Sequence, residues 1–333
     1  MFMLIGKKQI FMIALCFLVL CGCAVFGVCR TMAEEKEQEE YIKWVNFNIP
    51  YEVLEKAMKL DIDSHATDAP VDWVQLLAYS AAKNGDKKFS VAEIDKIAKQ
   101  LKEGSTIEQM TKNLKSYAYY HEAYEAVLGE FLSEYEIEVK DDTQESGKRW
   151  EKTYGLKAFS PIAKGYPYQD YDDFGNSRSY GYQRKHLGHD FMGAVGTPVI
   201  AVEGGTIENM GWNQYGGWRI GIRSFDGKRY YYYAHLRQNF PYHKSLEEGM
   251  QVQAGDVIGY LGRTGYSAKE NANNIDQSHL HFGMQLIFDE SQREGIHEIW
   301  IDVYDIAKLL RKNQSEVVKN PETKDYHRVY EIK

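Results

Sequence analysis

Short apolar runs separated by glycine turns fill the C-terminal half of the chain, and this pattern restricts the fold more than any other feature. Residues 198–202 read Pro-Val-Ile-Ala-Val and are followed by two glycines, and residues 257–261 form another such run. Asp226-Gly227 separates the runs 220–225 and 229–234, which is the strongest short-range signal for a β-hairpin. The sequence therefore predicts a mainly antiparallel β domain over residues 151–311.

Residues 41–135 carry a different pattern, which is typical of helices. Apolar residues at positions 53, 54, 57 and 58 follow helical spacing. Residues 90–93 (Ser-Val-Ala-Glu) and 105–108 (Ser-Thr-Ile-Glu) both match the capping box that opens a helix. We therefore expect an all-α helical domain whose aromatic residues form its core. It shows no group of catalytic residues, and a protein partner for it is an open question.

Two polar segments are expected to lie outside these domains. Residues 136–150 are rich in charged residues, Ser and Gly, which is typical of a linker. Residues 312–333 are polar and have no clear period, so we expect a loose polar tail.

Residues 10–28 are 19 positions without a charge, which is long enough to cross a bilayer. Lys7 and Lys8 precede the run and glutamates follow it, which keeps the N-terminus in the cytoplasm and exports the rest. We therefore predict that residues 1–33 form a transmembrane signal-anchor, giving a single-pass protein of the cytoplasmic membrane. A signal peptide cleaved after Ala33 and a lipid-modified Cys23 are alternatives, and all three imply export.

Cysteine usage and charge exclude several classes of protein. All four cysteines lie in the first 30 residues, which rules out a disulfide scaffold or a cysteine-ligated metal in the remainder. The net charge is −8, and the first 30 residues contain no acid, so the exported part is more acidic still. Nucleic acid binding needs a basic surface and is therefore not expected.

Histidines cluster at three places in the predicted β domain. They are His186-Leu-Gly-His-Asp190, His235 at the end of a β-rich run, and His279-Leu-His281. On a strand, residues two apart face the same way, so His279 and His281 should project together. Two imidazoles and one carboxylate are a usual ligand set for catalytic zinc, with a position left for water.

These motifs resemble those of the M23 peptidases, the lysostaphin- and LytM-like zinc endopeptidases of bacterial cell walls. The matching patterns are His-x-Gly-x-Asp from 186, Tyr-x-His-Leu from 233 and Ser-x-Leu-His-Phe from 278. The similarity covers about residues 155–290 and does not extend to the helical domain. It implies a β domain of the barrel-sandwich-hybrid type.

The resemblance also implies a function and a role for each residue. The chain would be a membrane-anchored zinc endopeptidase that hydrolyses peptide bonds in peptidoglycan stem peptides or cross-links, on the cell-wall side. His186, Asp190 and His281 match the ligands of one zinc ion per chain, and His235 and His279 match catalytic histidines that are not ligands. One of these two would take a proton from water and the other would stabilise the oxyanion, and the sequence leaves open which does which.

Other classes of function remain as alternatives. A LytM-like domain can be a catalytically silent scaffold, such as an amidase activator or a component of a sporulation complex, although such members generally lack a ligand. A carrier domain of the biotinyl or lipoyl type would need a modifiable lysine at a hairpin tip, and none stands out.

Three features of the β domain carry further expectations. Gly283 stands where many relatives carry an acidic residue. The long aromatic stretch between 161 and 186 should form a groove wall or a cover over the zinc, and one of its carboxylates is a candidate fourth ligand in a latent form; these are Asp170, Asp172 and Asp173. His189 has an odd offset from Asp190, so it should face away from the metal.

Overall fold

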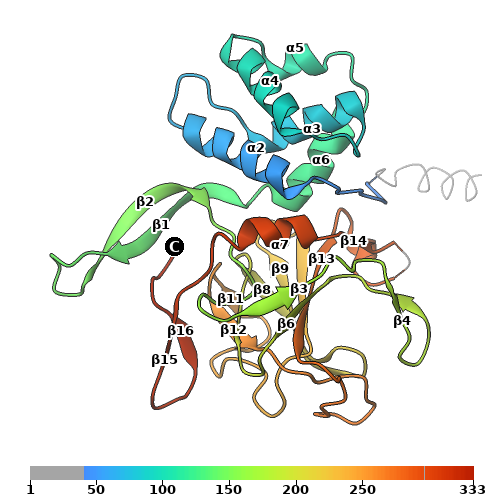
Figure 1. Ribbon diagram of the computed structural model, residues 1–333, viewed down its shortest axis with the longest axis vertical. Helices are drawn as coiled ribbons and strands as arrows, with labels where there is room; N and C mark the ends of the chain where they lie inside the picture. The colour runs from blue at the N-terminus through green and yellow to red at the C-terminus, as the bar shows by residue number, and fades with distance from the viewer. Residues whose placement is uncertain (1–40, 296) are drawn as a thin grey trace, which may run out of the picture. The chain divides into compact units, whose positions relative to one another are not determined.

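The N-terminal part of the described chain is helical, as its sequence predicts. The structure is a computed structural model, and it describes residues 41–295 and 297–333. The helices of this region are α2 (Tyr51–Ser64), α3 (Trp73–Asn84), α4 (Val91–Lys102), α5 (Ile107–Thr111) and α6 (Tyr117–Leu128) (Figure 1). Leu54, Leu76, Ile94 and Tyr124 are fully buried, so α2, α3, α4 and α6 share one core.

The start of α4 is the one its sequence predicts, and the start of α5 is shifted. Ser90 caps α4 by accepting a hydrogen bond from the backbone N–H of Glu93. The capping box of α5 is formed by Thr106 and Gln109, one residue later than expected. Both registers offer a hydroxyl followed three residues later by Glu or Gln, so the motif alone does not separate them.

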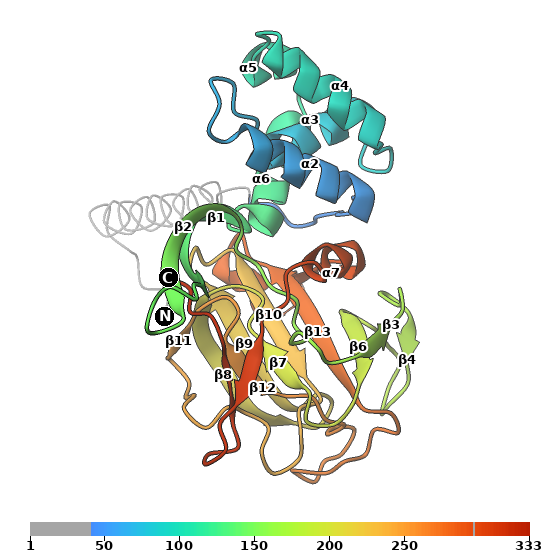
Figure 2. The same cartoon turned by 60° about the vertical axis from the view of Figure 1, so that its left-hand side comes forward.

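The C-terminal part is built on an antiparallel sheet. Its strand order is β11-β8-β9-β10-β13-β6-β3, and β14 pairs with β13. The strands are β3 (Tyr168–Asp170), β6 (His189–Gly193), β8 (Gly205–Asn213), β9 (Gly217–Ser224), β10 (Arg229–Ala234), β11 (Gln251–Val252), β13 (His279–Leu286) and β14 (Ile299–Trp300). Figure 2 shows β9, β10 and β13 side by side. Two smaller pairs are formed by β7 (Pro198–Ile200) with β12 (Val257–Tyr260), and by β4 (Ser177–Arg178) with β5 (Arg184–Lys185).

The hairpin of β9 and β10 forms at the predicted Asp226-Gly227 turn. Gly227 has a φ of 76°, a conformation that glycine adopts without strain. The tyrosines of β10 alternate between the two faces of the sheet: Tyr231 and Tyr233 are fully buried in the core, whereas Tyr230 and Tyr232 line a cavity on the opposite face. The sheet therefore has one core face and one cavity face.

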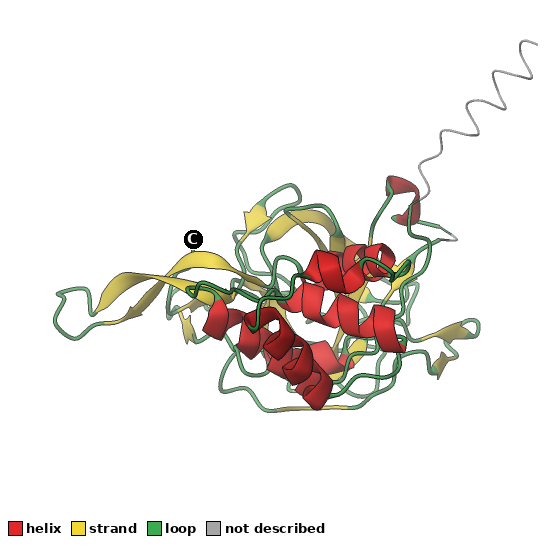
Figure 3. Cartoon of the chain, turned by 90° about the horizontal axis from the view of Figure 1, so that it is seen from above, coloured by secondary structure: helices red, strands yellow, loops and turns green. Residues whose placement is uncertain are grey.

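The predicted linker over residues 136–150 is wrong. These residues belong to a long hairpin of β1 (Leu132–Lys140) and β2 (Lys148–Leu156), paired from Leu132 with Leu156 to Lys140 with Lys148. Figure 3 shows this hairpin extending to one side of the helices. Residues 134–140 of β1 alternate polar and apolar side chains, but in β2 Lys148 and Lys152 share a face with Trp150, so the pattern does not continue and the polar composition of the segment hid it.

The predicted loose tail over residues 312–333 is also wrong. It contains the hairpin of β15 (Val317–Lys319) and β16 (Tyr326–Arg328). Beyond it, the backbone N–H groups of Glu136 and Lys333 each donate to the other residue's carbonyl, at 3.0 and 2.9 Å, and Ile332 is only 3% exposed. Pairing with the distant β1 orders this segment, which its own sequence does not indicate.

The helical region and the sheet belong to one compact unit, residues 42–333. Helix α7 (Tyr304–Leu310) lies between α2 and the sheet (Figures 1 and 2). Arg229 of β10 is fully buried, forms ion pairs with Glu203 and Asp226 at 2.8 and 2.9 Å, and donates to the carbonyl of Ala126 in α6 at 2.7 Å. A buried charge network therefore joins the two parts.

The predicted transmembrane segment, residues 10–28, lies outside the described residues. Within residues 41–295 and 297–333, no helix has the length and apolar character needed to span a membrane.

Candidate active site

The five residues singled out in the sequence line one cavity on the sheet. His279 and His281 project from β13 onto the cavity face, as their spacing predicts, while Leu280 and Phe282 between and after them are buried in the core. Asp190 lies directly opposite His281 in the pairing of β6 with β13. His186 precedes β6, and His235 follows β10.

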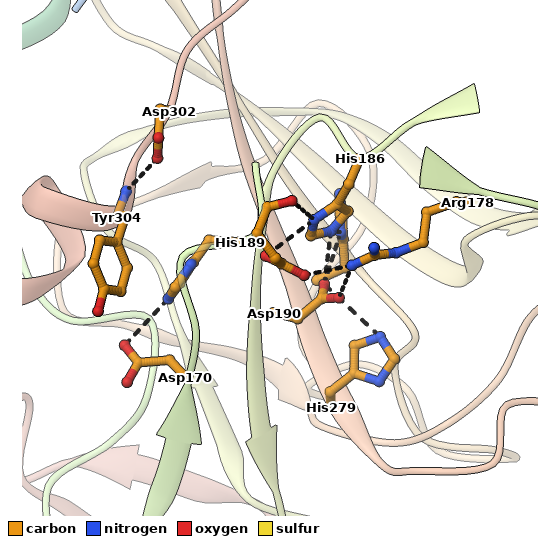
Figure 4. A network of polar contacts seen from close by, with 10 residues as sticks. Asp170, Arg178, His186, His189, Asp190, His279, Asp302 and Tyr304 are labelled. Atoms are coloured by element: carbon orange, nitrogen blue, oxygen red, sulfur yellow. Dashed lines mark hydrogen bonds and ion pairs between the residues drawn. The ribbon is translucent and has the colours of Figure 1, made fainter. Parts of the chain in front are cut away.

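His186, Asp190 and His281 direct one atom each toward a common point. His186 Nε2 lies 3.0 Å from Asp190 Oδ1 and 2.9 Å from His281 Nδ1, which is itself 3.0 Å from Asp190 Oδ1. Figure 4 shows the His186 and Asp190 side chains turned toward each other. All three atoms lie within 4.8 Å of one another, which is the geometry of a group that can hold a metal ion.

The hydrogen bonding of His186 fits a metal ligand. Its other ring nitrogen, Nδ1, lies 3.1 Å from Asp173 Oδ1, so this nitrogen carries the proton. Nε2 then presents its lone pair toward Asp190 and His281. Two imidazole nitrogens and a carboxylate oxygen around one point are a donor set that suits zinc.

The pKa values of His186 and Asp190 reflect their contacts within this cluster. Burial opposes protonation of His186, but its hydrogen bonds to Asp173 and Asp190 raise its pKa to about 9. Burial also opposes ionisation of Asp190, yet its hydrogen bonds with His186 and His281 hold the pKa of this carboxyl well below its usual range. The carboxylates of Asp173 and Asp190 thus favour positive charge at the point where the three atoms meet.

None of the three carboxylates considered as a fourth ligand belongs to the metal-binding group. Asp173 contacts the far nitrogen of His186 and forms an ion pair with Arg178, whose Nη2 also lies 3.2 Å from Asp190 Oδ2. Asp170 pairs instead with His189 and Arg311, at 3.1 and 2.7 Å. Asp172 is exposed.

His235 and His279 lie beside this cluster with similar hydrogen bonding. His235 Nδ1 is 2.9 Å from the carbonyl of Thr264, and His279 Nδ1 is 2.9 Å from the carbonyl of Gln277. A carbonyl only accepts, so each Nδ1 carries a proton and each neutral ring has its lone pair on Nε2. His279 Nε2 lies 3.8 Å from Asp190 Oδ1. The two ring centroids are 4.7 Å apart.

His235 has an unusual backbone conformation. Its φ is +60°, a region that residues other than glycine rarely adopt and that adds strain. Two hydrogen bonds hold the backbone just after His235. The N–H of Leu236 donates to the carbonyl of Trp218, and the carbonyl of Leu236 accepts from the Thr264 hydroxyl. Burial lowers the pKa of His235 well below its ordinary value, with His279 adding to the effect. The imidazole is thus held neutral at a strained position.

Two glycines, Gly188 and Gly283, each leave room for an aromatic ring beside β13. A side chain at Gly188 would lie 2.6 Å from the His281 ring and 2.7 Å from the Phe282 carbonyl, which explains the glycine in the His-x-Gly-x-Asp motif. A side chain at Gly283 would lie 2.8 Å from the ring of Trp300 on β14. Trp300 therefore occupies the space above Gly283 in this chain.

The cavity extends well beyond the metal-binding residues. It has a volume of about 910 Å³. As expected for the aromatic stretch before His186, one wall comes from the segment of β4 and β5. There the Arg184 guanidinium lies over the rings of Tyr215 and Tyr266, 5.1 and 5.2 Å from their centroids, and Tyr180 stacks on Tyr266.

The remaining histidines of this region do not contribute to the cluster. His189 is 2% exposed and points away from the cavity face to Asp170, as its offset predicts (Figure 4). His243 lies near His327, with ring centroids 5.0 Å apart. Sequence reasoning missed Arg178, because a single arginine in a short polar segment gives no signal that it will reach Asp190.

Comparison with known proteins places the β domain in a family. Residues 184–293 match the model of peptidase family M23. An L-Ala–D-Glu endopeptidase of Bacillus subtilis is 39% identical over 124 residues, which are 37% of this chain and 36% of that protein. Lysostaphin of Staphylococcus simulans is 39% identical over 98 residues, which are 29% of this chain and 17% of that protein. The chain thus matches about a third or less of these relatives' length.

A solved structure agrees with this assignment at the level of the fold. The crystal structure of a LytM-type protein from Ruminococcus gnavus has a TM-score of 0.51 at 21% identity, covering 83% of this chain and 92% of that chain. The chain therefore carries an M23 peptidase domain, mainly antiparallel β, preceded by a helical region. Peptidases of this family are zinc-dependent, and this domain is homologous to lysostaphin and to the L-Ala–D-Glu endopeptidase.

Proposed function

We propose that this protein is a zinc endopeptidase that hydrolyses peptide bonds in bacterial peptidoglycan. The observation that supports this most strongly is the complete set of five residues around one cavity: His186, Asp190, His235, His279 and His281. A scaffold without activity has no need to keep two unligated histidines beside a metal-binding cluster. The named relatives are endopeptidases, which supports the same reaction class.

His186, Asp190 and His281 would hold the zinc ion. Zinc supplies Lewis acidity, which makes a water nucleophilic at neutral pH and polarises the carbonyl to be cut. Asp173 fixes the ring orientation of His186 through Nδ1, and Arg178 holds the second oxygen of Asp190.

His279 and His235 would move the protons. Both rings present an unprotonated Nε2, so either one accepts a proton before it donates one. His279 Nε2 lies near Asp190, where it can take a proton from the attacking water. His235 Nε2 is likewise a proton acceptor, and whichever of the two rings takes the proton of the attacking water can then deliver it to the departing amine nitrogen. The hydrogen bond of His235 to the Thr264 carbonyl keeps this ring in place.

Residues 10–28 would anchor the protein in the cytoplasmic membrane, with the helical and β domains on the cell-wall side. The uncharged run and the lysines before it support this topology. Retention in the membrane fraction after a carbonate wash, with the β domain accessible to external protease, is the expected result. Release of a shortened soluble protein would indicate a cleaved signal peptide instead.

Zinc content and product release together test the enzymatic proposal. The full chain should contain about one zinc per protein and release defined products from cross-linked muropeptides, measured by mass spectrometry. Chelation should abolish release, and added zinc should restore it. A folded protein that binds no zinc, or that binds zinc and cuts no muropeptide, would favour the scaffold alternative.

A further inference from the structure

Arg219 lines the cavity and forms no ion pair with any acidic residue among those that the structure describes. It lies on β9, and its Nε is buried without a hydrogen-bond partner. Arg223, four residues further along β9 and on the same face, is by contrast paired with Glu208 and Glu290 at 3.2 and 3.4 Å. A guanidinium keeps its proton in a protein, and although Arg219 as a whole is half-buried, its buried Nε–H lacks an acceptor, which is unfavourable. This position is therefore suited to an anion from outside the chain.

Arg219 lies in the same row of the sheet as the metal-binding residues. Ile220 pairs with Tyr233, so Arg219 comes next along β9, beside Ala234. Ala234 pairs with His281, and His281 pairs with Asp190. Arg219 is thus two strands from His281, about 10 Å at the usual spacing between strands. The only side chain between them in this row is the methyl group of Ala234.

Two tyrosine hydroxyls flank Arg219 along β9. The Tyr230 ring lies over Gly221 and the Tyr232 ring reaches over Gly216, and any side chain at either glycine would overlap with a hydroxyl. Each hydroxyl accepts a hydrogen bond from an asparagine, Asn209 or Asn213, at 3.3 Å. The phenolic protons thus stay free to donate into the cavity.

These hydroxyls remain protonated at neutral pH. Burial raises the pKa of Tyr230 to about 12, and burial also raises the pKa of Tyr232. A guanidinium with two O–H donors beside it matches the lone pairs of a carboxylate.

We propose that Arg219, Tyr230 and Tyr232 form a subsite that binds a free carboxylate of the peptide substrate, about 10 Å from the metal-binding atoms. This inference rests on the proposed function, and it makes the enzyme selective for acidic peptides. The carboxylate belongs either to an acidic side chain near the cut bond or to the end of the peptide chain, since the chemistry of recognition is the same.

Binding of matched peptides to the full chain tests this subsite. Three peptides of one sequence are needed: one with a free side-chain carboxylate only, one with a free terminal carboxylate only, and one with both amidated. Calorimetry should show that one of the acidic peptides binds wild-type protein at least tenfold more tightly than the doubly amidated one. Which acidic peptide it is identifies the source of the carboxylate.

Substitutions at Arg219 separate recognition from structure. Arg219→Met should weaken binding of that acidic peptide at least tenfold and leave the doubly amidated peptide unaffected, while Arg219→Lys should retain part of the preference. Arg149→Met is the matched control, because it removes an arginine of the exposed hairpin outside the cavity and should change neither affinity. Zinc content should equal wild type in all three variants.

Several outcomes would overturn the subsite. One is equal binding of all three peptides by the wild-type protein. Another is that Arg219→Met keeps the full preference for the acidic peptide. A third is that Arg219→Met loses its zinc, or binds neither the acidic nor the doubly amidated peptide. Hydrolysis is measured separately on the zinc-loaded protein. If it binds acidic peptides selectively but cuts none of them, the proposed function fails and the subsite stands.

Discussion

His279 and His281 lie two residues apart on β13, and their contacts separate their roles. His281 Nδ1 is 2.9 Å from His186 Nε2 and 3.0 Å from Asp190 Oδ1, whereas His279 approaches Asp190 only to 3.8 Å. At the scale of single residues, one histidine is thus part of the metal-binding group and the other is its neighbour.

Alanine substitutions should separate these two roles. His279→Ala should retain about one zinc per chain through His186, Asp190 and His281, while turnover of muropeptides falls by about 10²–10⁴, the usual effect of losing a general base. His281→Ala should lose the metal, because two ligands hold zinc weakly. Zinc content by mass spectrometry and product release measure both effects. Equal zinc loss in the two variants would show that the pair is assigned wrongly.

Gly188 leaves room for the ring of His281 in the candidate metal site. Gly188→Ala should push the His281 ring from its position and lower zinc affinity by about 10- to 100-fold, since groups that orient ligands have effects of this size. A competition assay with a zinc chelator measures it. Gly155→Ala is the control, because a methyl group there meets nothing within 4 Å, and it should bind zinc like wild type.

At the scale of elements, strand spacing explains what the sequence could and could not predict about the site. The period of two placed His279 and His281 on one face from local sequence alone. The pairing of Asp190 with His281 joins β6 and β13, which lie far apart in the chain, so the family resemblance rather than the spacing indicated it. Arg219 gave no signal, because an arginine in a strand ordinarily faces solvent.

The hairpin of β1 and β2 and the tail were missed for different reasons. The hairpin pairs locally, but the high charge of its residues resembles that of a linker, whereas the tail gains order from a partner distant in sequence, as in the bridge between Ile137 and Ile332. Helices α2 to α6 were easier to predict, because their hydrogen bonds and apolar spacing are local.

Ile332→Ala tests whether the tail is part of the fold. This side chain is 3% exposed, so the substitution should lower the free energy of unfolding by about 2–5 kcal/mol. Denaturant unfolding followed by circular dichroism measures this change. Val318→Ala in β15 is the control, since Val318 is 56% exposed and should change stability by about 0.5 kcal/mol or less. Equal effects would argue against an ordered tail.

At the scale of the whole molecule, the helical region and the sheet share one continuous core, and Arg229 connects them. Its ion pairs with Glu203 and Asp226 and its bond to the Ala126 carbonyl come from three separate parts of the chain. The helical region is thus fastened to the back of the strands that carry the site.

Arg229→Met should destabilise the protein strongly. It leaves Glu203 buried without a countercharge, which typically lowers the free energy of unfolding by about 3–5 kcal/mol. Arg149→Met, which removes the ion pairs of an exposed arginine with Asp141 and Glu151, should lower it by at most about 1 kcal/mol. Denaturant unfolding compares the two. Similar values for both variants would mean that the network does not join the helical region to the sheet.

The left-handed conformation of His235 bears on how such proteins change over evolution. Glycine at this position would relieve the backbone strain, so His235 lowers stability, a cost that its proposed chemical role would offset. A related protein without that chemical role would gain stability by replacing His235, whereas replacing His281 would relieve no backbone strain. If the proposed activity is lost in a related protein, His235 should therefore be replaced early, and a glycine there beside an intact set of His186, Asp190 and His281 would identify such a protein.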